Sequence, residues 1–173
     1  MWKELSRQTV FDVGFRKIDK VEYELSDGRR VDYYVRVVRS TAVVLALTPE
    51  QNVILVKQFR PGKNCLVTDL PGGGIKIDQS SLEAAQAELE EETGYTGDLQ
   101  FVGESWPDAY SSRVSNVFVA TSCQVLPGGQ KLDENEFIEV QLMSIKEFRS
   151  FIRTGRMTDI DAAYLGLDFL GLL

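Results

Sequence analysis

One stretch, residues 71–95, constrains the fold and the chemistry of this chain more than any other. It reads PGGGIKIDQSSLEAAQAELEEETGY: a glycine cluster, then a helical pattern that ends in a dense run of glutamates before Gly94. Ser80 and Glu83 have the spacing of a capping box, and Gly94 stands where a C-cap glycine belongs. Carboxylates at the C-terminal end of a helix face the negative end of its dipole and repel one another. A bound divalent cation would offset that cost.

The glutamates at the end of this predicted helix divide by face. At about 100° per residue, Glu88, Glu91 and Glu92 share one side of the helix. Three apolar side chains point another way and are predicted to pack on a sheet: Leu82, Ala85 and Leu89. Clustered carboxylates suit a hard cation such as Mg²⁺ or Mn²⁺, and the preceding glycines let backbone carbonyls approach the same point. An acidic helix face that is simply solvated is the alternative interpretation.

Charge and the absence of histidine narrow the classes of function. The 173 residues include 19 basic and 26 acidic ones, and the net charge of -7 argues against nucleic acid as a partner. The chain has no histidine, which excludes Ser-His-Asp and Cys-His triads and HExxH zinc sites. A general base must therefore be a carboxylate, a lysine, a tyrosine or a metal-bound hydroxide.

The cysteines and the apolar segments predict a cytoplasmic protein that does not enter a membrane. Cys65 and Cys123 lie far apart and form no CxxC pair, so neither a zinc site nor a disulfide framework is expected. The longest apolar run, residues 42–47, is too short to cross a bilayer. Residues 1–10 lack the apolar core that a signal peptide needs.

The hydrophobic pattern predicts an α+β fold in which strands precede and follow the acidic helix. Strands are expected before it at residues 9–15, 21–25, 30–38, 42–47 and 52–59, the second and third of them forming a hairpin. Strands are expected after it at residues 99–106, 114–122 and 137–143. Ser144 and Thr158 mark the starts of two further helices. This order fits a mixed sheet with helices on its faces, and the continuous apolar run at residues 42–47 indicates a strand buried on both faces.

Residues 73–95 resemble the Nudix box, GX5EX7REUXEEXGU, in which U is an aliphatic residue. The opening glycine is Gly73, and the tail AELEEETGY covers residues 87–95. The resemblance implies a set of metal ligands in which the first residue contributes its carbonyl oxygen: Gly72, Glu88, Glu91 and Glu92.

Two positions depart from the box together. Gln79 replaces its first glutamate and Ala87 replaces its arginine, so the salt bridge that these two residues form in the family is absent. Losing both partners leaves no unpaired charge. We interpret the change as loss of a structural pair with the metal ligands retained.

The resemblance extends over most of the chain and points to the ADP-ribose pyrophosphatase branch of the family. VKQFRP at residues 56–61 and DLPGG at residues 69–73 look like its VxQxR…E-(L/F)-P-(A/G)-G pattern, with Asp69 in place of the usual glutamate. DENE at residues 133–136 resembles the loop that brings a catalytic glutamate to the metals. TGRMTD at residues 154–159 resembles the start of the last helix of that branch.

The fold that the resemblance implies is the Nudix fold, a mixed β-sheet sandwiched between helices, with an N-terminal antiparallel β extension. Residues 1–40 would form this extension, which in that branch often pairs two subunits. Residues 41–173 would form the Nudix hydrolase domain. A homodimer is therefore expected.

The implied activity is Mg²⁺-dependent hydrolysis of the diphosphate in a nucleoside diphosphate linked to another moiety, with Mn²⁺ as an alternative ion. ADP-ribose or an ADP- or GDP-sugar would give a nucleoside monophosphate and a sugar phosphate. The implied catalytic residues are the metal ligand Glu91 and, as the base, Glu134 or Glu136. The implied substrate-binding residues are Arg60, Gln58 and Arg113, the last at a position where many relatives carry a glutamate.

A rival interpretation is a Nudix-fold sensor that binds such a nucleotide with weak turnover or none. Gln79, Ala87 and Arg113 motivate it, because each departs from the pattern of the active family. Two local alternatives also stand. Residues 133–136 can be an ordinary acidic surface loop, and Arg60 can form a salt bridge at a strand end.

Overall fold

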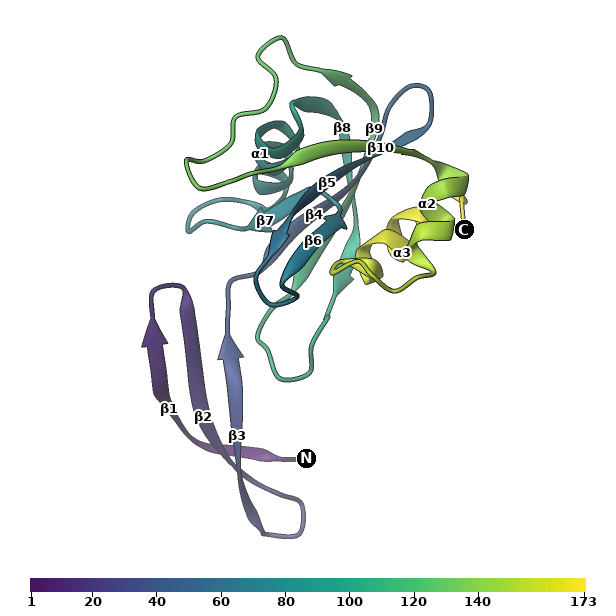
Figure 1. Ribbon diagram of the computed structural model, residues 1–173. Coiled ribbons are helices and arrows are strands. Elements are labelled where there is room, and N and C mark those ends of the chain that lie inside the picture. The colour runs from purple at the N-terminus through teal and green to yellow at the C-terminus, as the bar shows by residue number, and fades with distance from the viewer. The chain divides into compact units, whose positions relative to one another are not determined.

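The computed structural model describes residues 1–173, and the chain divides into two compact units. The first unit contains residues 1–40 and 106–114, and the second contains residues 41–105 and 115–173. Figure 1 shows the strands of the first unit in purple and blue and labels the elements of both.

The first unit is a three-stranded antiparallel sheet in the order β1-β2-β3. Its strands are β1 (Lys3–Val13), β2 (Arg16–Glu24) and β3 (Arg30–Val37). The predicted hairpin between the second and third strands is present, and Gly28 adopts a left-handed φ of 84° in its turn. The prediction placed the first strands too late, because β1 is an exposed and largely polar strand without the alternation that marks a buried face.

The second unit is built on a seven-stranded mixed sheet with the central order β10-β5-β4-β9-β8. Strands β4 and β9 are parallel, β6 pairs with β5, and β7 pairs with β4. The strands have these bounds: β4 (Thr41–Leu47), β5 (Asn52–Arg60), β6 (Cys65–Asp69), β7 (Gly72–Gly74), β8 (Tyr95–Ser105), β9 (Ser115–Val125) and β10 (Glu139–Ser144). The sequence pattern did not predict β6 and β7, because both are short, β7 consists of three glycines, and Pro71 lies between them.

Helices cover both faces of this sheet (Figure 1). The side chains of α1 (Ser81–Thr93) form one core with alternate residues of β4, and those of α2 (Ile145–Ile152) and α3 (Ile160–Phe169) form the other. Residues 42–47 of β4 are all buried, so the predicted two-sided burial is confirmed. None of these helices has the length and apolar content that crossing a membrane requires.

The helix starts agree with the sequence in two cases of three. Capping boxes at Ser80 and Ser144 open α1 and α2 as predicted. The third helix begins at Ile160 with Asp159 as its N-cap, one residue after the predicted start at Thr158, and Asp159 makes no side-chain capping hydrogen bond. The prediction that Leu82 packs on the sheet is wrong: it is exposed, and Ala84 takes its place in the core.

Candidate active site

The glycine turn before α1 brings backbone and carboxylate into direct contact. β7 pairs with β4, and the Gly72 N–H donates a hydrogen bond to Glu92 Oε2 at 2.8 Å. A Cβ on Gly72 would lie 2.5 Å from the Ala42 carbonyl oxygen, so only glycine lets the two strands approach this closely. The last turn of α1 is therefore anchored on the strand that precedes it, and Glu92 is 6% exposed.

Gly73 makes the second contact between this turn and α1. A Cβ built there would lie 2.2 Å from Glu88 Oε1. The Glu88 carboxylate thus rests in the space that a larger residue at position 73 would fill. Gly72 therefore donates a hydrogen bond to Glu92, and Gly73 leaves room for the carboxylate of Glu88. Both glutamates are predicted metal ligands.

The electrostatics of the two glutamates follow from burial and from neighbouring acids. Burial raises the pKa of Glu92 to about 8, and the charges of Glu88 and Glu136 add to the rise, whereas the Gly72 N–H and Arg60 oppose it. Burial raises the pKa of Glu88 to about 7, with further contributions from the charges of Glu91 and Glu136. These carboxyl groups resist ionisation because like charges face one another in a site with little solvent.

The acidic loop at residues 133–136 contributes charges that act on Glu88 and Glu92. The Glu136 N–H donates to the Asp133 carbonyl oxygen at 2.9 Å, and the Asp133 N–H donates to Glu136 Oε2 at 3.1 Å. Glu136 is the loop glutamate whose charge raises the pKa of both Glu88 and Glu92. Glu134 is exposed on the same turn.

A basic group stands on the strand beside these acids. Arg60 Nε lies 3.2 Å from Asp69 Oδ2, and Asp69 is fully buried and also accepts the Thr158 N–H at 2.7 Å. The sequence is compatible with either a salt bridge or a substrate contact for Arg60. The salt bridge is present, and the charge of Arg60 also acts on Glu92. Gln58 is half-buried two residues earlier, so β-strand alternation places it on the same face of β5.

Arg113 lies in a different unit from Gln58, Arg60 and the glutamates of α1. It belongs to the first unit, where its N–H donates to Ser111 Oγ at 3.2 Å. Asp69 is the residue of this region whose function the sequence did not reveal. No local pattern gives this role, because Arg60 and Asp69 meet only through the pairing of β5 with β6.

A family model described as the NUDIX domain matches residues 37–162. The chain belongs to the Nudix family. This finding confirms the predicted family, and the protein is a Nudix pyrophosphohydrolase by class.

Two curated relatives and one solved structure illustrate the match. The Nudix chain is 26% identical over 164 residues to the ADP-ribose pyrophosphatase of Bacillus subtilis, covering 94% of this chain and 89% of that protein. It is 30% identical over 129 residues to the ADP compounds hydrolase NudE of Escherichia coli, covering 69% of each. A crystal structure of an ADP compounds hydrolase matches with a TM-score of 0.81 at 21% identity, covering 99% of this chain and 97% of that one. The predicted Nudix fold with its N-terminal antiparallel sheet is confirmed.

The two departures from the Nudix box leave no unpaired charge. Gln79 Oε1 accepts the Lys76 N–H at 3.0 Å, so the glutamine closes the turn that leads into α1. Ala87 is half-buried on the helix. A neutral turn closure therefore stands where the family's salt bridge would be.

The donor set of this Nudix site fits a hard divalent cation in its chemistry. No three acidic side chains converge closely enough to form a complete ligand cluster, since Glu92 is turned toward the Gly72 amide and Glu91 is exposed. All the available donors are oxygens, which Mg²⁺ and Mn²⁺ prefer. Burial and, after it, repulsion between neighbouring carboxylates raise the pKa of Glu88 and Glu92, and a cation would neutralise the negative charge that causes this repulsion.

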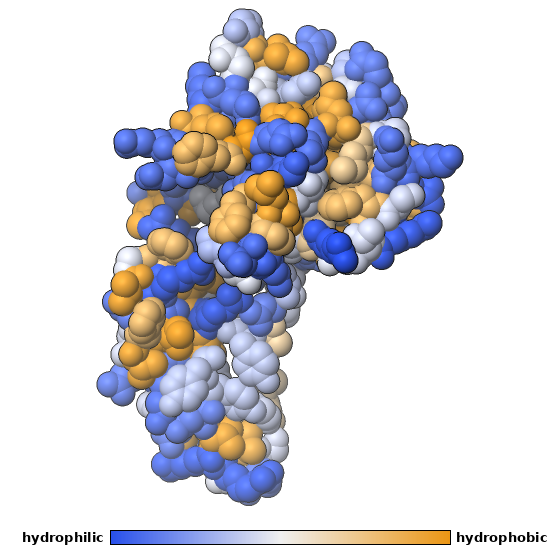
Figure 2. All heavy atoms as spheres, viewed as in Figure 1, coloured by the Kyte–Doolittle hydropathy of each residue, from blue (hydrophilic) through white to orange (hydrophobic).

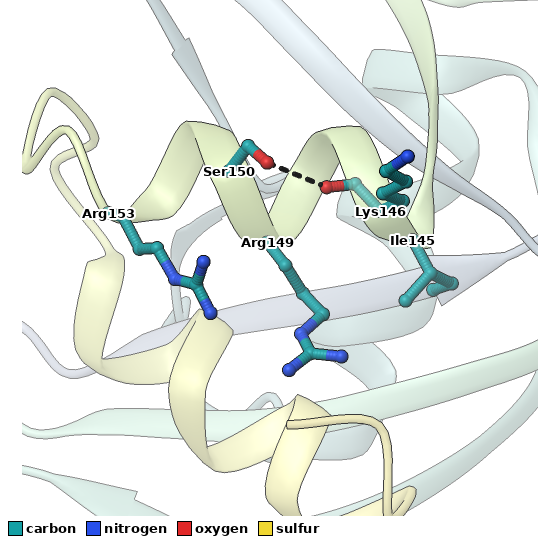
Figure 3. A pocket seen from close by; sticks show the side chains of 5 residues that line it. All are labelled: Ile145, Lys146, Arg149, Ser150 and Arg153. Carbon is teal, nitrogen blue, oxygen red and sulfur yellow. Dashed lines mark hydrogen bonds between the residues drawn. The ribbon is translucent and has the colours of Figure 1, made fainter.

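A hollow elsewhere on the surface is distinct from this site. It is lined by side chains of α2 and of its C-cap residue: Ile145, Lys146, Arg149, Ser150 and Arg153. Figure 3 shows Arg149 and Arg153 extending from the same side of α2, and Ser150 Oγ donating to the Lys146 carbonyl oxygen. Because α2 packs on the sheet face opposite α1, this hollow does not reach the glutamates.

The raised pKa values predict how the metal-free protein responds to pH. Between the ordinary glutamate value of 4.5 and about 7 to 8, the folded protein holds protons on Glu88 and Glu92 that the unfolded chain has released. Stability should therefore fall as the pH rises through this window. Thermal unfolding in EDTA should show a lower midpoint at about pH 8 than at about pH 6, and Mg²⁺ should raise the midpoint more at the higher pH. A midpoint that is flat or rising over this range would contradict the assignment.

Proposed function

We propose that this Nudix pyrophosphohydrolase hydrolyses the diphosphate of ADP-ribose or of a related ADP- or GDP-sugar. The observation that carries the proposal is the pair of carboxylates, Glu88 and Glu92, held against the glycine turn with Arg60 beside them. The printed names of the B. subtilis and E. coli relatives support the substrate class.

In this proposal Glu88, Glu91, Glu92 and the Gly72 carbonyl oxygen hold Mg²⁺, with Mn²⁺ as an alternative. The ion, when bound, neutralises the diphosphate and lowers the pKa of the attacking water. Arg60, already oriented through its Nε by Asp69, offers its terminal nitrogens to the phosphate oxygens, and Gln58 contacts the substrate from the same strand.

The reaction consumes one water. Its oxygen forms a bond to one phosphorus atom, and the bond from that phosphorus to the bridging oxygen breaks. A carboxylate accepts the water proton, since the chain has no histidine. The products are a nucleoside monophosphate and a sugar phosphate.

Glu136 is the better candidate for this base, because its charge acts on both Glu88 and Glu92. Glu136→Gln should lower kcat about 10²- to 10⁴-fold, the usual contribution of a general base. Glu134→Gln should have a much smaller effect. Steady-state kinetics of the two variants decide the question, and equal, near-wild-type rates would remove the loop from the mechanism.

The alternative is a nucleotide-binding sensor with weak turnover or none, which the substitutions Gln79 and Ala87 favour. A panel of ADP-ribose, sugar nucleotides, dinucleoside polyphosphates and nucleoside triphosphates separates the two. With Mg²⁺ present, hydrolysis of an ADP- or GDP-sugar supports the enzyme. Nucleotide binding without hydrolysis of any compound supports the sensor.

The first unit supports the proposal of a homodimer. A three-stranded sheet needs a packed hydrophobic face for independent stability, and β1 is exposed along almost its whole length. Large apolar side chains lie exposed on β1 and the turn that follows it: Val10, Phe11, Val13 and Phe15. Figure 2 shows orange, hydrophobic residues on the surface of this unit. Light scattering should give twice the 19.4 kDa chain mass, and a monomer at micromolar concentration would exclude this interface.

The cellular setting that fits best is the cytoplasm. Cys65 and Cys123 are both free thiols, which suits a reducing compartment. The net charge of -7 argues against nucleic acid as a partner.

A further inference from the structure

The C-terminal end of α1 is covered by a loop instead of by basic side chains. Helix ends leave carbonyl oxygens without intrahelical partners, and the last turn of α1 contains no basic residue to meet them. The Lys131 N–H donates to the Glu91 carbonyl oxygen at 2.9 Å, and the Leu126 N–H donates to the Gly94 carbonyl oxygen at 2.7 Å. The Glu92 carbonyl oxygen accepts at 2.6 Å from Gln130 Nε2, which is the one side-chain donor among the three.

Gln130 makes a second hydrogen bond from the same nitrogen. Its Nε2 also donates to the Ile138 carbonyl oxygen at 3.2 Å, so the two amide protons serve two different segments of the chain. Ile138 is buried and directly precedes β10, whereas Glu92 lies in the last turn of α1. The side chain therefore ties the helix of the ligands to the end of the acidic loop.

The hydrogen bonds of Gln130 lie at the two ends of the acidic loop. Residues 131–138 begin immediately after Gln130 and end at the residue that its side chain holds. Between these two points lie Asp133 and Glu136, whose charges act on Glu88. Both ends of the loop are thus fixed on α1, through the Lys131 N–H and through Gln130.

We propose that Gln130 is a positioning residue that holds the acidic loop against the carboxylates of α1. It contacts neither substrate nor metal, and it acts through the backbone of Glu92 and Ile138. The kinetic part of this inference rests on the proposed function, because only there does the loop supply the base. The structural part, that the side chain restrains residues 131–138, does not depend on it.

Gln130→Glu and Gln130→Ala test the proposal, with Gln124→Glu and Gln124→Ala as matched controls. Glutamate keeps the length of the side chain but has no proton to donate to either carbonyl when ionised. Gln124 is exposed on β9, and no hydrogen bond of its side chain is seen. Both Gln130 variants should lower kcat at least tenfold with KM changed by no more than about threefold, as expected for misplaced catalytic groups.

Amide hydrogen exchange gives a readout that does not depend on turnover. Loss of both bonds should speed exchange in the peptide 131–138 about tenfold, a typical effect of removing one or two hydrogen bonds, with no change in the core strands β4 and β9. An unchanged exchange rate, or a kcat within twofold of wild type, would overturn the proposal. If the wild-type protein hydrolyses nothing, the proposed function fails and the exchange comparison alone decides the role of Gln130.

Discussion

Replacing Glu92 with glutamine should lower kcat by about 10³-fold or more and at the same time stabilise the metal-free protein near pH 8. The loss of activity follows because a metal ion supplies several kcal/mol of transition-state stabilisation, and each 1.4 kcal/mol is a factor of ten in rate. The gain in stability follows because the buried carboxylate, with a pKa raised to about 8, is replaced by a neutral group. The new amide oxygen can still accept the Gly72 N–H.

Glu90→Gln is the matched control for this change. Glu90 lies on the same helical turn, but its carboxylate accepts hydrogen bonds from Gln86 and Thr96, away from the glycine turn. This variant should keep both its activity and the pH dependence of its unfolding. Kinetics with Mg²⁺ and thermal unfolding in EDTA measure the two effects separately. Hydrolysis by Glu92→Gln within tenfold of wild type would refute the metal assignment.

The second large effect is expected from a single methyl group at Gly73. Gly73→Ala places a Cβ where the Glu88 carboxylate now lies, 2.2 Å from Oε1. The carboxylate is the end of a flexible side chain, so it can move aside and the fold should persist. A displacement of about 1 Å at a catalytic group typically reduces the rate about 100-fold, and we expect a loss of at least that size.

Two neighbouring glycines make this prediction specific. A Cβ on Gly74 would meet no atom within 4 Å, so Gly74→Ala should leave kcat and the unfolding midpoint close to wild type. A Cβ on Gly72 would meet the Ala42 backbone at 2.5 Å, so Gly72→Ala should lower the unfolding midpoint instead. If Gly73→Ala and Gly74→Ala have the same kcat, the close approach of Gly73 to Glu88 does not contribute to activity.

The parts of the fold that the sequence predicted are those with strong local signals. The buried run at residues 42–47 and the capping boxes at Ser80 and Ser144 place β4, α1 and α2 correctly, because each feature depends on a few adjacent residues. The three-residue β7 could not be predicted, since it is a strand only through its pairing with β4. Leu82 was assigned to the core by periodicity, but the helix is rotated so that two alanines contact the sheet.

For the candidate site, the sequence predicted the residues better than the contacts between them. The spacing of Glu88, Glu91 and Glu92 indicated one helix face, and the structure shows that only Glu92 is buried while Glu91 is exposed. Two other features depend on long-range packing and left no local pattern: the buried partner Asp69 of Arg60, and the hydrogen bonds of Gln130.

Hydrolysis of the diphosphate can be followed directly by ³¹P NMR of ADP-ribose incubated with the protein and Mg²⁺. We expect the diphosphate resonances to disappear and two phosphomonoester signals to replace them, one from a nucleoside monophosphate and one from a sugar phosphate. Excess EDTA should prevent the change, because the clustered carboxylates of α1 depend on a divalent cation to act. Diphosphate resonances that persist unchanged with Mg²⁺, while the nucleotide binds, would exclude the proposed hydrolysis and identify a sensor.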